Sequence, residues 1–180
     1  MTNLEGLSMA ELVVLAGGSF VEEPRAERLQ VHASTDELAR EIARRVTKRS
    51  LETRELLDQP ELVARWVALR YARDDQEVLG ALYLDVRSRL IEDREVFRGT
   101  VGKCSVDVRP ILRGAIECGA STIVLFHTHP SGDPSPSAQD ILFTEKLHAA
   151  TRTLSLVLAD HVICGSADRF TSLHRTGALK

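Results

Sequence analysis

A short apolar run that ends in two histidines constrains the fold of this 180-residue chain more than any other feature. Residues 121–126 (STIVLF) lie just after Gly119 and are rich in β-branched side chains, so they predict a buried β-strand. His127 and His129 stand at the end of this strand. Because side chains two positions apart on a strand point to the same face, we expect both imidazoles to reach one point in space.

The residues after the histidines predict a loop and then a helix. Residues 130–136 contain three prolines and a glycine and cannot continue a strand. Residues 141–148 have apolar side chains at helical spacing, and Ser137-x-x-Asp140 ahead of them resembles a capping box. A cap explains Ser137 and Asp140 by itself but neither histidine, so a role in capping and a role in chemistry both stay open here.

Taken together, His127, His129 and Asp140 are a ligand set suited to zinc, because imidazole and carboxylate are common ligands of this ion. Three protein ligands leave the fourth tetrahedral position for a water molecule. That stoichiometry is typical of a catalytic zinc site, whereas structural sites use four protein ligands.

These residues carry a family resemblance. His127-x-His129-Pro130, followed after six residues by Ser137-x-x-Asp140, resembles the JAMM motif of MPN-domain zinc metallohydrolases. Residues 95–100, 125–132 and 160–163 and the tail near Gly177 are similar to the RadC-like branch, and the resemblance covers about residues 60–180. It implies an α+β (α/β) fold of the MPN type, a mixed β-sheet flanked by helices, with one zinc per chain on the two histidines and the aspartate.

The family also uses an upstream glutamate as a base. Glu77 opens a continuous apolar strand, residues 77–85, that is similar to the family segment carrying this glutamate. Glu92 and Glu95 are the rivals, but they lie in a charged run that is more simply an exposed strand edge or turn. We therefore predict that Glu77 is the base, the alternative being a solvated residue at the end of the acidic run 74–77.

The chemistry implied by such a site is hydrolysis. Bound zinc lowers the pKa of a water molecule from about 15.7 to about 7, and a nearby carboxylate takes up and later returns the proton. Glu77 would do this proton work, and the Ser137 hydroxyl would donate to the oxyanion that forms on attack. The resemblance thus predicts a JAMM-type metallopeptidase that cleaves an amide or isopeptide bond in a peptide or protein conjugate.

Two other function classes remain as alternatives. One is a non-catalytic MPN interaction scaffold, against which the intact ligand set argues. The other is a DNA-associated accessory protein, because the RadC-like family carries a DNA-repair label. A single mononuclear site suits two-metal phosphodiester chemistry poorly, and a net charge of −3 gives no overall attraction to nucleic acid. The arginines of residues 40–49 and 65–73 alternate with acids and indicate solvated helix faces.

The N-terminal third predicts a small helical segment, residues 1–57, before a catalytic domain at 58–180. We expect a first helix ended by Gly17 and Gly18, a linker near residues 21–25, and helices that begin at Thr35 or Asp36 and at Pro60. Relatives continue into a helix-hairpin-helix with a Gly-x-Gly turn suited to DNA backbone contact. Residues 19–76 have no such turn, so direct DNA contact through that module is not predicted.

Composition indicates the size of the core, the expected location of the protein and the state of its cysteines. A hydrophobic content of 43% suits one ordinary core, and there is no apolar stretch that could span a bilayer and no signal peptide, so we expect a cytoplasmic protein. The three cysteines, Cys104, Cys118 and Cys164, are expected to be reduced and partly buried. His161, in a strand predicted at 154–164, is expected to be structural or to support the metal ligands. The remaining histidines, the substrate and the oligomeric state are left unassigned.

Overall fold

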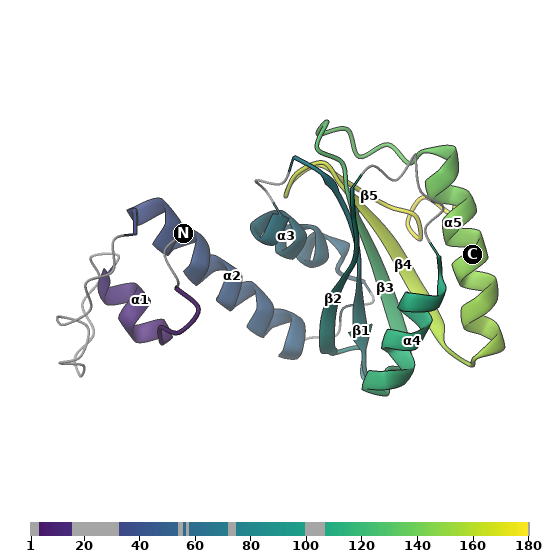
Figure 1. Ribbon diagram of the computed structural model, residues 1–180, viewed down its shortest axis with the longest axis horizontal. Helices are drawn as coiled ribbons and strands as arrows, with labels where there is room; N and C mark the ends of the chain where they lie inside the picture. The colour runs from purple at the N-terminus through teal and green to yellow at the C-terminus, as the bar shows by residue number, and fades with distance from the viewer. Residues whose placement is uncertain are drawn as a thin grey trace. The chain divides into compact units, whose positions relative to one another are not determined.

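The computed structural model describes residues 4–15, 33–53, 56, 58–71, 75–99 and 107–179 (Figure 1). Three predictions lie outside these residues: the helix end at Gly17 and Gly18, the linker near 21–25, and the state of Cys104. The chain falls into two compact units, Met1–Arg49 and Ser50–Lys180, which are described separately below. The predicted boundary between a helical segment, residues 1–57, and a catalytic domain, residues 58–180, stays a prediction.

The first unit contains helix α1 (Met9–Leu15) and most of helix α2 (Thr35–Thr53), which begins at Thr35, one of the two start residues predicted from the sequence. Both helices start with a capping box. In α2 the Ser34 backbone N–H donates to the Glu37 carboxylate at 2.8 Å, and the Glu37 N–H donates back to Ser34 Oγ at 3.2 Å. Two of the four free amides at the helix start are thereby satisfied.

The second unit is built on one five-stranded sheet in the order β2-β1-β3-β4-β5. Its strands are β1 (Glu77–Leu84), β2 (Leu90–Gly99), β3 (Thr122–Thr128), β4 (Val157–Cys164) and β5 (Phe170–Ser172). Strands β3 and β4 are parallel and the other neighbours are antiparallel, so the sheet is mixed. The predicted α+β fold with a mixed sheet is confirmed.

Helices cover both faces of this sheet (Figure 1). Helix α3 (Pro60–Tyr71) lies on one face, and helices α4 (Arg109–Cys118) and α5 (Ala138–Thr153) lie on the other. The strands alternate between two apolar cores. Val78 and Phe126 pack with Trp66 of α3, whereas Leu79 and Leu125 pack on the side of α4 and α5. Odd-numbered positions of β1 and β3 therefore face α5, because side chains of a strand alternate.

Two local features end α4 and β1 at the opposite end of the sheet from His127. Helix α4 stops at Gly119, whose φ of 69° lies in the left-handed region where a residue without a side chain is favoured. A turn at residues 85–88 joins β1 to β2, with the Ser88 N–H donating to the Asp85 carbonyl at 2.9 Å. Cys118 is half-buried and Cys164 is buried, and both are free thiols, as expected from the sequence.

Candidate metal centre

Strand β3 delivers the two predicted histidines to one end of the sheet. Its last pair with β1 is Leu79 opposite His127, so His127 faces the α5 side. The chain is held beyond the strand because the His129 N–H donates to the Cys164 carbonyl at 2.8 Å. The two rings meet edge to face, with 4.7 Å between their centroids. The prediction that both imidazoles reach one point is confirmed.

Glu77 joins the histidines through the register of β1. It stands two residues before Leu79 and therefore faces the same side as His127. One ligand atom each from Glu77, His127 and His129 lies within 4.8 Å of the others, a grouping that can hold a metal ion. The start of β1 is fastened to the end of β3 by the Val78 N–H, which donates to Thr128 Oγ1 at 2.9 Å. This hydrogen bond thus fixes the position of the Glu77 backbone relative to the end of β3.

The rival glutamates do not belong to this cluster. Both lie on β2, which is separated from β3 by β1. Glu92 pairs with Arg94, and Glu95 pairs with Arg98 at 2.7 Å. These hydrogen bonds from arginine hold the pKa of each carboxyl below its usual value. Among the residues that the structure describes, Glu77 is the one glutamate grouped with the two histidines.

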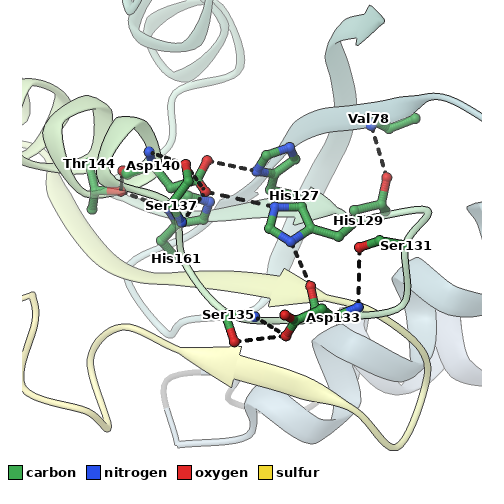
Figure 2. A network of polar contacts seen from close by, with 11 residues as sticks. Val78, His127, His129, Ser131, Asp133, Ser135, Ser137, Asp140, Thr144 and His161 are labelled. Atoms are coloured by element: carbon green, nitrogen blue, oxygen red, sulfur yellow. Dashed lines mark hydrogen bonds and ion pairs between the residues drawn. The ribbon is translucent and has the colours of Figure 1, made fainter. Parts of the chain in front are cut away.

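Asp140, in the first turn of α5, contacts both imidazoles (Figure 2). Its Oδ1 lies 3.0 Å from His127 Nδ1, and its Oδ2 lies 3.7 Å from His129 Nε2. The carboxylate is buried, with 4% of the side chain exposed. Burial alone would raise the pKa of Asp140. The contact with His127 and the hydrogen bonds from Ser137 lower it by more than burial raises it, so the pKa of Asp140 lies well below its usual value.

Ser137 caps α5 with the same carboxylate. Its N–H and its hydroxyl donate to Asp140 Oδ2 at 2.8 and 2.7 Å, and its Oγ accepts the Asp140 N–H at 3.1 Å. The predicted capping box is therefore present, and the role of Asp140 as a metal ligand stays a prediction. The cap engages Oδ2, so Oδ1 is directed toward His127.

The loop after β3 sets the orientation of the His129 ring. His129 Nδ1 lies 2.7 Å from the Asp133 backbone carbonyl, which can only accept, so Nδ1 carries the hydrogen and Nε2 of the neutral ring carries the lone pair. The loop is held by a turn in which the Gly132 N–H donates to the His129 carbonyl at 2.9 Å. A Cβ on Gly165 would lie 2.3 Å from the Gly132 oxygen, so the two segments pack backbone to backbone.

The buried ring nitrogens of His127 indicate whether these residues fit a metal ion. Both of its ring nitrogens are buried, and neither has a hydrogen-bond partner of good geometry, although Asp140 Oδ1 is 3.0 Å from Nδ1. An unsatisfied buried polar atom costs about 1–3 kcal/mol, so such atoms usually mark an absent partner. A metal ion bound through one imidazole nitrogen would remove this cost. The two imidazoles and the Glu77 carboxylate, with ligand atoms within 4.8 Å of one another, can hold a metal ion.

Two further side chains lie beside the site. The sequence predicts a structural or supporting role for His161 and gives no prediction for Thr144. His161 lies behind His127, with the rings nearly parallel and 6.3 Å between centroids. Its Nδ1 is 2.7 Å from Thr144 Oγ1, which in turn is 2.6 Å from the Asp140 backbone carbonyl. Burial lowers the pKa of His161 to about 3, so the ring is neutral. The only sequence signal for Thr144 is its spacing of one helical turn from Asp140.

Comparison with known proteins agrees with this geometry. Residues 57–178 match the family described as the RadC-like JAB domain. The chain is 37% identical over 125 residues to a UPF0758 protein of Streptococcus agalactiae serotype III, an alignment that covers 69% of this chain and 55% of that relative. It is 33% identical over 168 residues to a UPF0758 protein of Streptococcus suis, covering 93% of this chain and 64% of the relative.

A third relative is the UPF0758 protein of Burkholderia ambifaria, 39% identical over 139 residues, with 77% of this chain and 54% of that protein aligned. The chain thus spans between about half and two thirds of the length of these curated relatives. The matched region contains the whole sheet and all four residues that meet at the end of β3. On the family match and on these identities, the chain belongs to the RadC-like JAB domain family.

Proposed function

We propose that this protein is a zinc-dependent hydrolase that cleaves an amide or isopeptide bond. The observation that carries the proposal is the meeting of Glu77 with two imidazoles within 4.8 Å, at a place where Asp140 also contacts both rings. His127, His129 and Asp140 would hold one zinc per chain. When bound, zinc supplies a Lewis acid that activates water and polarises a carbonyl group.

Glu77 is assigned as the general base. The two histidines and Asp140 would already make the three protein ligands of a catalytic zinc site, which leaves the second carboxylate of the cluster, that of Glu77, for proton transfer. Glu77 enters from β1, whereas the other three residues come from β3, its following loop and α5. Its carboxylate is within reach of the same point as the imidazoles and can take a proton and return it to the leaving amine.

Ser137 is assigned as the donor to the oxyanion. Its single hydroxyl hydrogen is donated to Asp140 Oδ2, while its Oγ accepts the Asp140 N–H. The second bond keeps the oxygen in place, so rotation about the Cβ–Oγ bond alone would redirect the hydrogen toward a substrate oxygen. A hydrogen-bond donor to the oxyanion typically contributes about 10²–10³-fold to the rate.

The substrate class follows from this chemistry. Water attack on a carbonyl with return of the proton to an amine suits a peptide bond or the isopeptide bond of a protein conjugate. We test the proposal by elemental mass spectrometry of protein purified without added metal or chelator, followed by hydrolysis of fluorogenic peptides and isopeptide-linked conjugates. One zinc per chain and zinc-dependent cleavage are expected.

The variants separate metal binding from catalysis. Glu77→Gln is expected to keep its zinc and to lose at least about 100-fold in turnover, because removal of a general base typically costs 10²–10⁴-fold. His129→Ala is expected to lose the zinc. Glu95→Gln is the matched control, since Glu95 is a strand glutamate paired with Arg98, and it should retain both properties. Full turnover by Glu77→Gln, or zinc-loaded protein that cleaves none of these substrates, would contradict the proposal.

A further inference from the structure

A buried polar chain links β4 to the start of α5 (Figure 2). His161 on β4 and Thr144 on α5 are in contact through their side chains, and Thr144 contacts the backbone of Asp140 one helical turn earlier. His161 is fully buried and Thr144 is 3% exposed. The chain therefore runs from the middle of the sheet to the carboxylate residue of the metal centre, inside the protein.

The direction of each hydrogen bond can be assigned. The Asp140 carbonyl only accepts, and its oxygen lies 2.6 Å from Thr144 Oγ1, too close for two oxygens without a hydrogen between them. The single hydroxyl hydrogen of Thr144 is therefore donated to Asp140. Thr144 Oγ1 must then accept from His161 Nδ1, at 2.7 Å, so the hydrogen of the His161 ring is on Nδ1.

The position of His161 is itself fixed by the strands. It pairs with Leu125 of β3, and its backbone N–H donates to the Asp160 carboxylate at 2.7 Å. Asp160 is held by the Ser172 hydroxyl at 2.6 Å and by the His174 N–H at 3.0 Å. His161 is thus an anchored donor, and Thr144 is the group on the helix that meets it.

A purely packing role would not require a histidine here. His161 Nε2 is buried without a hydrogen-bond partner, which costs about 1–3 kcal/mol. A phenylalanine would fill a similar volume without this cost. What the imidazole adds is the directed bond from Nδ1 to Thr144, and a displacement of Thr144 displaces Asp140 because both belong to the first turns of the same helix.

We propose that His161, acting through Thr144, is a positioning residue that holds the Asp140 carboxylate in place for the metal ion. The inference rests on the proposed function, in which Asp140 is a zinc ligand. It assigns His161 no contact with substrate and no step in the reaction. Groups that orient metal ligands in this way typically contribute about 10–100-fold to metal affinity.

The test is zinc affinity, measured by competition with a chromophoric chelator, together with the visible absorption spectrum of the Co²⁺-substituted protein. Thr144→Val removes the hydroxyl at nearly constant volume and is expected to weaken zinc binding about 10–100-fold and to change the Co²⁺ spectrum. Thr144→Ser keeps the hydroxyl and should restore both. Thr151→Val is the matched control, because Thr151 is a buried threonine on the same helix whose hydroxyl donates to the His148 carbonyl at 2.8 Å.

His161→Phe provides a second route to the same link. It should weaken zinc binding by about as much as Thr144→Val, and the double variant should be no weaker than either single one, because both changes break one connection. Urea unfolding of each variant establishes that it is folded. This pair of variants keeps the test decisive if one of them fails to fold.

The outcomes are separable. If Thr144→Val and Thr151→Val bind zinc equally and give the same Co²⁺ spectrum, while Asp140→Asn loses binding, the positioning role is wrong and the proposed function stands. If the wild-type protein binds neither ion, the proposed function fails and this inference falls with it. Loss of affinity in Thr144→Val with rescue in Thr144→Ser supports the positioning role.

Discussion

Helices α2 and α5 begin with the same capping hydrogen bonds in very different surroundings. At each start, the serine N–H and hydroxyl donate to one carboxylate oxygen of the acid three residues later, and the serine Oγ accepts that acid's N–H. The cap of Ser34 and Glu37 is exposed. The cap of Ser137 and Asp140 is part-buried, beside two imidazoles.

The comparison shows that a capping signature does not separate an acid that only caps a helix from one that also contacts two imidazoles. Both acids satisfy a helix start with one oxygen, and in Asp140 the second oxygen is 3.0 Å from His127. The difference arises from β3, which brings the histidines to the start of α5, and not from the four residues of the cap. If this interpretation is right, equivalent changes at the two caps must have different consequences.

The largest difference is expected in metal affinity. Asp140→Asn keeps the size of the side chain but removes its charge, and we expect zinc binding to weaken by more than about 100-fold, because loss of a ligand should exceed the 10–100-fold effect of a supporting residue. Glu37→Gln, the same change at the α2 cap, should leave zinc affinity unchanged. Competition with a chromophoric chelator measures both. Equal affinities in the two variants would remove Asp140 from the proposed ligand set.

The next difference is in acid stability of the metal-free protein. The pKa of Asp140 lies below its unfolded value, so its stabilising contribution is complete above about pH 4 and is lost as the pH falls through the folded pKa. One such proton changes the free energy of unfolding by up to about 1.4 kcal/mol per pH unit. Between pH 4 and pH 2, the wild type should therefore lose stability more steeply than Asp140→Asn.

Urea unfolding followed by Trp66 fluorescence suits this measurement, because Trp66 is the single tryptophan and is buried in the second unit. The difference between the two proteins isolates Asp140 from the other carboxylates. Parallel curves for the wild type and Asp140→Asn would show that the carboxylate is not stabilised by its contacts with His127 and Ser137 in the folded state.

Much of this site was predictable because its signals are local. The β-branched run before His127 and the prolines after His129 place a strand end and a loop on any reasonable reading of the sequence. The spacing of Ser137 and Asp140 predicts a helix start, and the helix begins there. Each of these features depends on residues a few positions apart.

The remaining features depend on register and on contacts between distant segments. The charged run around Glu92 and Glu95 disfavours them, and a family resemblance favours Glu77, but the contact of Glu77 with the histidines depends on the pairing of Leu79 with His127. The link from His161 to Thr144 spans 17 residues and joins a strand to a helix. Such contacts leave no periodic pattern, so sequence analysis could not find them.

The smallest expected difference concerns the capping serines themselves. Removing an N-cap hydroxyl costs about 0.5–2 kcal/mol of stability, and the cost rises when the freed amide is shielded from water. Ser137→Ala should therefore lie near the top of this range, because its cap is part-buried, and Ser34→Ala near the bottom, because water can replace the lost bond. Urea unfolding followed by far-UV circular dichroism reports on both helices. Equal losses would mean that the imidazoles beside Asp140 leave the cap as accessible to water as its counterpart on α2, and the contrast between the two helix starts would then reduce to the metal ligands alone.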